Sequence, residues 1–194
     1  MAQEITQMDI KRLFLSIAAV LFSRRKFLQD FFSARSSAEL NLQKDYALPV
    51  IAMVQLVKFP LVGTPRLAMY TALATFMLDI AALYLVTGGM IRLLGSGQAA
   101  ASDTDAAALA AFSLTPLWLV EPFYYFGGWS WLFASVAAVY AVVILIDGIN
   151  ELFKRNPPPV RVPHANASLL LVVVSIALFV VERGIIRLID TLHV

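Results

Sequence analysis

Five long apolar stretches alternate with short polar segments along the chain. They cover roughly Ala47–Val62, Leu67–Leu94, Ala106–Phe126, Trp129–Leu152 and Ser168–Ile189, with charged residues gathered at their edges. A helix needs about 20 residues to cross the ~30 Å hydrocarbon core of a bilayer. Lipid offers the backbone no hydrogen-bond partners, so apolar runs of this kind are expected to be helical. The pattern predicts an all-α integral membrane protein, with a bundle of five transmembrane helices over residues 47–194.

The composition agrees with this class of protein. Of the 194 residues, 60% are hydrophobic and 14% are charged, both far from the averages of soluble domains. The chain has no cysteine, and its two histidines, His164 and His193, lack the spacing of a metal site. We expect no cofactor, no metal site and no separate soluble domain.

Basic residues indicate how the bundle is oriented. Those that precede the first predicted span are Lys11, Arg12, Arg24, Arg25, Lys26, Arg35 and Lys44. Lys154, Arg155 and Arg161 lie between the fourth and fifth spans, whereas Arg66 lies in a loop on the opposite side. Because basic loops stay in the cytoplasm, we expect a cytoplasmic N-terminus. The odd number of spans then places the C-terminus in the periplasm or outside the cell.

Residues 1–46 are expected to form a cytoplasmic segment with an amphipathic helix at about residues 8–32. The apolar run Leu13–Phe22 is too short to span, and basic residues follow it where a signal peptide would have its cleavage site. At helical spacing the apolar side chains fall broadly on one side: Ile10, Leu13, Phe14, Ile17, Leu21, Leu28 and Phe32. This pattern is typical of a basic helix that lies in the membrane interface and binds anionic lipid. Docking of a partner protein is the alternative.

Several ionisable residues fall within the predicted spans or at their ends, where a charge costs ~2.5–3.5 kcal/mol on insertion scales. They are Lys58, Asp79, Glu121, Asp147, Glu182 and Arg183. From the helical rise, Lys58, Glu121, Glu182 and Arg183 are expected to share one layer near the outer end of the bundle. We expect Lys58 to pair with Glu121 or Glu182. Snorkelling of Lys58 and Arg183 to the interface is the alternative.

The other two acids are interpreted separately. Asp79 lies near the middle of the second predicted span, where no basic residue is expected at its depth. It either relays protons or contacts a substrate, or it is hydrogen-bonded within the bundle, and its isolation favours the structural interpretation. Asp147 lies near the cytoplasmic end of the fourth span and is expected to be interfacial, in contact with Arg92 or Lys154.

Three segments carry a family resemblance. Residues 46–52 open the first span with Tyr-Ala-Leu-Pro, residues 113–116 read Ser-Leu-Thr-Pro, and Tyr140 is followed by Asp147 and Gly148 in the fourth span. In order and spacing, these segments resemble the bacterial branch of the Yip1 family. The resemblance implies a five-helix membrane protein with a cytoplasmic N-terminus, and it supplies no catalytic residues. The chain lacks the long polar N-terminal region of the eukaryotic relatives, so their association with Rab GTPases is not carried over.

These observations lead to two functional hypotheses. The first is a non-enzymatic scaffold or accessory subunit of a bacterial cytoplasmic-membrane complex. Its partners would be membrane lipids and other membrane proteins or further copies of the chain, and nucleic acid would not be among them. The second is a small transporter or channel with Asp79 lining the path. An intramembrane enzyme would need a Ser/His, paired-Asp or metal group at one depth, which the sequence does not indicate.

Overall fold

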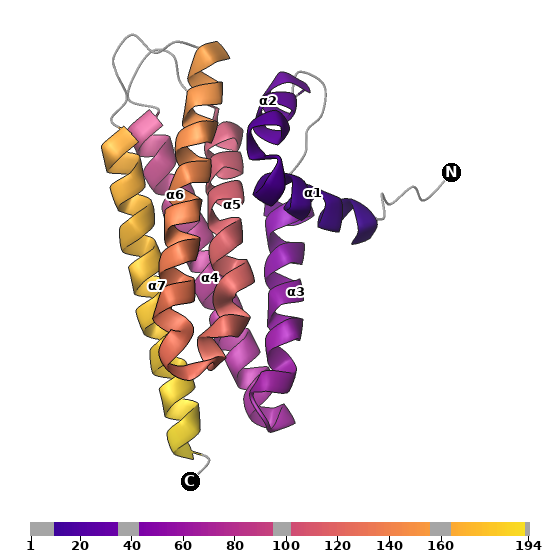
Figure 1. Cartoon of the computed structure of the whole chain (residues 1–194), viewed down its shortest axis with the longest axis vertical. Coiled ribbons are helices and arrows are strands. Elements are labelled where there is room, and N and C mark those ends of the chain that lie inside the picture. Colours follow the sequence, from indigo (N-terminus) through magenta and orange to yellow (C-terminus); the bar gives the residue numbers. More distant parts are fainter. Residues whose placement is uncertain (1–9, 35–42, 95–101, 156–163, 193–194) are drawn as a thin grey trace.

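The computed structural model describes residues 10–34, 43–94, 102–155 and 164–192, and the regular elements in these ranges are helical (Figure 1). Four helical segments are long and apolar enough to cross a membrane. They are built on α4 (Pro65–Leu94), α5 (Asp103–Val120) with the 3-10 turn η3 (Glu121–Tyr125), α6 (Ser130–Arg155) after the 3-10 turn η4 (Gly127–Trp129), and α7 (His164–Leu192). These segments match the second to fifth predicted spans. The all-α prediction is confirmed.

The first predicted span, Ala47–Val62, has a less regular form. Its central helix α3 (Leu48–Lys58) has 11 residues, about half of what a spanning helix needs. The π turn η1 (Gln43–Ala47) precedes α3 and the 3-10 turn η2 (Phe59–Leu61) follows it. Prolines occupy early positions in both α3 and η2, where the missing N–H is tolerated but cannot continue a preceding helix. α3 packs along α4 and α5 (Figure 1).

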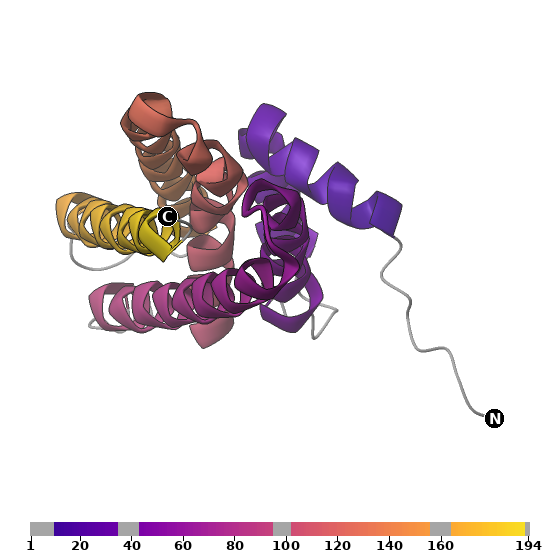
Figure 2. The same cartoon turned by 90° about the horizontal axis from the view of Figure 1, so that it is seen from below.

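α5 is the central helix of the bundle, with α4, α6 and α3 packed around it (Figure 2). Every residue from Ala108 to Trp118 is buried. Alanines at several of these positions allow the neighbouring helices to approach closely. The hydroxyls of Ser113 and Thr115 donate to carbonyls one turn earlier in α5, so they add no unsatisfied donor to this apolar core.

The N-terminal segment forms two helices where the sequence predicted one. α1 (Ile10–Phe22) and α2 (Arg24–Ala34) are separated at Ser23. α1 runs across the direction of the bundle, whereas α2 turns to pack on α6 (Figure 1). α2 lies at the same end of the bundle as the last turns of α4 and α6 and the first turns of α5 and α7 (Figure 1).

Some apolar side chains of α1 are buried and others are exposed. Leu13 and Ile17 are buried against the bundle, as the predicted apolar side requires. Phe14, which was placed on the same side, is 53% exposed, and Phe22 at the end of α1 is 86% exposed. Because α1 turns away from the bundle axis, part of its apolar surface has no cover within the described residues.

Gly148 provides a test of the packing between α5 and α6. A Cβ atom at this position would overlap the side chain of Leu109 on α5, which is buried. We expect Gly148→Val to lower the free energy of unfolding by roughly 1–3 kcal/mol, as overpacking does, measured by thermal unfolding in detergent. Gly184→Val on α7 is the matched control because open space surrounds position 184. An equal loss in both variants would contradict this role of Gly148.

Candidate functional site

Four ionisable side chains from four helical elements meet inside the bundle. Lys58 ends α3, Asp79 lies in the middle of α4, Glu121 begins η3 and Glu182 lies in the second half of α7. None of these residues is more than 3% exposed. We call these four residues the buried charge cluster.

Lys58 is the centre of the cluster. Its Nζ atom lies 2.5 Å from Glu121 Oε2, 3.0 Å from Glu182 Oε1 and 3.1 Å from Thr75 Oγ1. These contacts use all three donors of the ammonium group. The predicted pairing of Lys58 is confirmed, with both acids rather than one. Snorkelling of Lys58 to the interface is ruled out by its burial.

Gln55 connects the cluster from α3, one turn before Lys58. Its Nε2 atom donates to Asp79 Oδ2 at 2.9 Å and lies 3.5 Å from Glu121 Oε2, while its Oε1 accepts from Thr75 at 2.6 Å. The sequence interpretation missed Gln55. The available signal was its spacing, because residues three or four apart share one face of a helix. This relation places Gln55 beside Lys58, and Thr75 beside Asp79.

Asp79 is not isolated, and this part of the prediction was wrong. Its carboxyl group interacts with Lys58, Glu121 and Glu182, and its Oδ1 atom is buried without a hydrogen-bond donor among the described residues. The helical rise had placed Asp79 deeper than these groups. α4 is inclined to the long axis of the bundle (Figure 2), so its residues span less depth than in an upright helix. The long side chains of Gln55 and Glu121 cover the rest of the distance.

Arg183 does not snorkel freely either. Its Nη1 atom donates to the backbone carbonyl of Tyr124 at 2.8 Å, which joins α7 to η3. The preceding residue, Glu182, faces the cluster. Adjacent residues of α7 therefore serve separate contacts, one with Lys58 and one with the backbone of η3.

Asp147 belongs to a second polar group, at the α2 end of the bundle. Asp147 Oδ2 lies 2.5 Å from Arg24 Nε, and its Oδ1 lies 3.4 Å from Arg25 Nε. The hydrogen bond with Asp147 raises the pKa of the Arg24 guanidinium. The prediction of Arg92 or Lys154 as the partner was wrong. The reason is that α2 folds over α6 and brings its own arginines to Asp147, while Lys154 pairs with Glu151 at 2.5 Å.

Two contacts of Tyr140 strengthen this attachment of the N-terminal helices. The phenol of Tyr140 on α6 donates to the carbonyl of Leu21 at the end of α1. The Arg24 guanidinium also lies over the Tyr140 ring, 5.7 Å from its centroid, which is within the range of a cation–π interaction. Both contacts hold the α1–α2 corner against α6.

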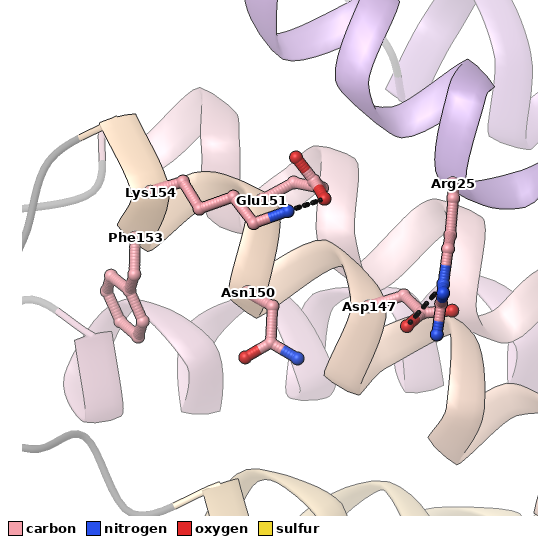
Figure 3. A pocket seen from close by; sticks show the side chains of 6 residues that line it. All are labelled: Arg25, Asp147, Asn150, Glu151, Phe153 and Lys154. Carbon is pink, nitrogen blue, oxygen red and sulfur yellow. Dashed lines mark hydrogen bonds and ion pairs between the residues drawn. The ribbon is translucent and has the colours of Figure 1, made fainter.

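An open pocket lies beside the Arg24–Asp147 pair. Its lining residues are Arg25, Asp147, Asn150, Glu151, Phe153 and Lys154 (Figure 3). The charged side chains that line it pair with one another, Arg25 with Asp147 and Lys154 with Glu151 (Figure 3). This mutual pairing gives the pocket no single sign of charge that would favour an anionic or cationic ligand.

The chemistry of the buried charge cluster follows from its groups. It can stabilise a positive charge away from water and can exchange protons among its carboxyl groups. In the part of the chain that the structure describes, no three His, Cys, Asp or Glu side chains are arranged to hold a metal ion.

Comparisons of the chain with protein-family models, curated proteins and solved structures give no match.

Replacing Lys58 tests how much the buried charge cluster contributes to the free energy of unfolding. Lys58→Met leaves three buried acids without their ammonium partner, and we expect a loss of roughly 3–5 kcal/mol in the free energy of unfolding. Adding Glu121→Gln to Lys58→Met should recover part of this loss, because one uncompensated carboxylate is then removed. Thermal unfolding of the single and double variants in detergent measures the coupling.

The control for this cycle is Lys154→Met, whose side chain is 71% exposed in its pair with Glu151. An exposed pair of this kind contributes about 1 kcal/mol or less. Additive effects of Lys58→Met and Glu121→Gln would show that the two side chains do not interact.

Proposed function

We propose that this protein is a small transporter or channel of a bacterial inner membrane, and that its path for small cations passes the buried charge cluster. The observation that carries the proposal is the meeting of Lys58, Asp79, Glu121 and Glu182 inside an apolar helix bundle. Ionisable groups within membrane spans typically mark ion pathways or proton relays. No catalytic role is part of the proposal.

The cluster favours transport over a purely structural role for two reasons. The structural interpretation of Asp79 depended on its isolation, and Asp79 in fact lies among three other charged groups. In addition, buried ion pairs contribute little net stability, because well-packed apolar residues of similar volume often serve as well or better. A bundle that only had to hold its helices together would not need three acids and a base at this position.

The proposed topology has five spans, with the N-terminus in the cytoplasm and the C-terminus on the other side. The helical stretch from Gln43 to Leu61 supports a fifth span, since it extends roughly 28 Å at the α-helical rise. This length is close to the ~30 Å of the hydrocarbon core. Leu56 and Val57 on α3 are exposed, as residues facing lipid would be. A five-helix arrangement also agrees with the resemblance to the Yip1 family, and we propose membership of that family together with this topology.

Reconstitution tests the transport proposal. Purified protein in liposomes should pass protons, Na⁺ or K⁺ faster than empty liposomes under an imposed gradient, followed with ion-sensitive dyes inside the vesicles. Asp79→Asn should reduce the flux to the level of empty liposomes while the protein keeps its elution profile in detergent. Asp30→Asn on α2 is the matched control because Asp30 is exposed and far from the cluster in sequence. Wild-type flux equal to that of empty liposomes for all three ions would contradict the proposal.

A second candidate function is that of a scaffold or accessory subunit, and the exposed surface of α1 favours it. Phe14, Leu15 and Phe22 are 53–86% exposed, and Lys11 and Arg12 on the same helix are also exposed. A basic helix with uncovered apolar side chains binds the membrane interface or a partner protein. We therefore propose that α1 is the amphipathic interfacial helix of this protein.

Purification from native membranes in mild detergent tests the scaffold function. A stoichiometric membrane partner should remain bound to Asp79→Asn and should be lost from the double variant Phe14→Ser/Leu15→Ser, because only the latter changes the exposed face of α1. The control is Gln29→Ser/Asp30→Ser, which changes exposed polar residues of α2. Mass spectrometry of the purified material identifies the partner. Recovery of the chain alone would contradict this function.

A further inference from the structure

The charges in the buried charge cluster do not balance. With all groups ionised, one ammonium, that of Lys58, faces the three carboxylates of Asp79, Glu121 and Glu182. The residues lie in the apolar interior, at most 3% exposed. Like charges that lie close together in an apolar interior repel one another strongly, because the interior screens them far less than water does. A second positive charge, or the loss of a negative one, would remove most of this repulsion.

The carboxyl groups of Asp79 and Glu121 are neighbours. A single atom, Gln55 Nε2, lies 2.9 Å from Asp79 Oδ2 and 3.5 Å from Glu121 Oε2. The two side chains are also within hydrogen-bonding reach of each other. Two carboxyl groups that share one buried site do not both ionise, and they retain one proton between them.

The Oδ1 atom of Asp79 gives an independent indication that the carboxyl group of Asp79 is protonated. This atom is buried in a residue that is 1% exposed, and it has no hydrogen-bond donor among the described residues. Nearly all buried polar atoms in proteins have a hydrogen-bond partner, so such an atom needs an explanation. A proton on the carboxyl group of Asp79 turns an unsatisfied acceptor into a donor toward Glu121.

The other groups around Asp79 do not supply the missing positive charge. Lys58 is already in contact with Glu121 and Glu182. Arg183 on α7 directs its guanidinium to the carbonyl of Tyr124. The phenol of Tyr124 lies within electrostatic range of the three carboxyl groups, and as a neutral group it leaves their total charge unchanged.

We propose that the buried charge cluster is a proton-binding site, in which Asp79 holds one proton against Glu121, and that the proton is the ion for which the path exists. The identity of the ion rests on the transport function proposed above, whereas the binding of a proton does not. Loss of this proton changes the total charge of the cluster by one negative unit, and its return restores the hydrogen bond between the two carboxyl groups.

Infrared spectroscopy of the purified protein in lipid tests the proposal directly. A protonated carboxyl group has a carbonyl-stretching band that is separate from the bands of carboxylates and amides, and the band shifts in D₂O. Exposed carboxyl groups titrate near pH ~4, so they contribute no such band at neutral pH. We expect the wild-type protein to show the protonated band at neutral pH. Asp79→Asn should lose it, and Asp30→Asn should keep it.

The wild-type spectrum decides the matter even where a variant does not fold. Absence of the band at neutral pH in wild-type protein would overturn proton binding, and stabilisation by Na⁺ in that case would identify a metal cation as the occupant. A band that persists unchanged in folded Asp79→Asn would also overturn it. Different outcomes decide between proton binding and the transport function. A protein with the band and no flux holds a proton that it does not move, whereas flux without the band leaves transport standing and removes the proton from the cluster.

Discussion

The cost of placing charge in an apolar interior governs how this bundle is assembled. The ammonium group of Lys58 has three hydrogen-bond partners away from water, and these contacts bring together α3, α4, η3 and α7. The cation also ends α3, where the helix dipole favours positive charge. Removing Lys58, Glu121 or Glu182 would leave a desolvated charge, so the contacts of this one side chain help to hold the four elements together at the cluster.

The opposite end of the bundle uses polar contacts that are less deeply buried. Asp147 is paired with Arg24 and Arg25, and Tyr140 reaches the carbonyl of Leu21. Water screens partly exposed pairs, so losing one partner of such a pair costs less than losing one partner of a buried pair. The N-terminal helices are therefore attached by several modest contacts, together with the packing of buried side chains such as Leu28. The two ends of the molecule differ in how firmly their elements are joined.

The sequence predicts the helices better than it predicts their contacts. Hydropathy places the second to fifth spans within a few residues, because lipid admits little but helix over such runs. It also predicts that Lys58 pairs with an acid, since a buried ammonium needs one. The inclination of α4, the corner at Ser23 and the fold of α2 over α6 are tertiary features without a periodic signal. For this reason the neighbours of Asp79 and the partners of Asp147 were not predicted correctly.

Between these two ends, α5 forms an almost continuous apolar barrier. The hydroxyls of Ser113 and Thr115 are satisfied by their own helix, and Tyr46 adds a buried hydrogen bond to Thr115. Besides Asp79 Oδ1, two buried side-chain atoms lack hydrogen-bond partners among the described residues, Thr87 Oγ1 on α4 and Trp118 Nε1 on α5. Thr87 lies about two turns beyond Asp79 toward the α2 end of α4. The buried positions of α4 between Asp79 and Thr87 are Ala82, Leu83 and Val86, all of them apolar. The apolar barrier of α5 therefore continues along this part of α4, and apolar side chains separate Asp79 from the α2 end of the bundle.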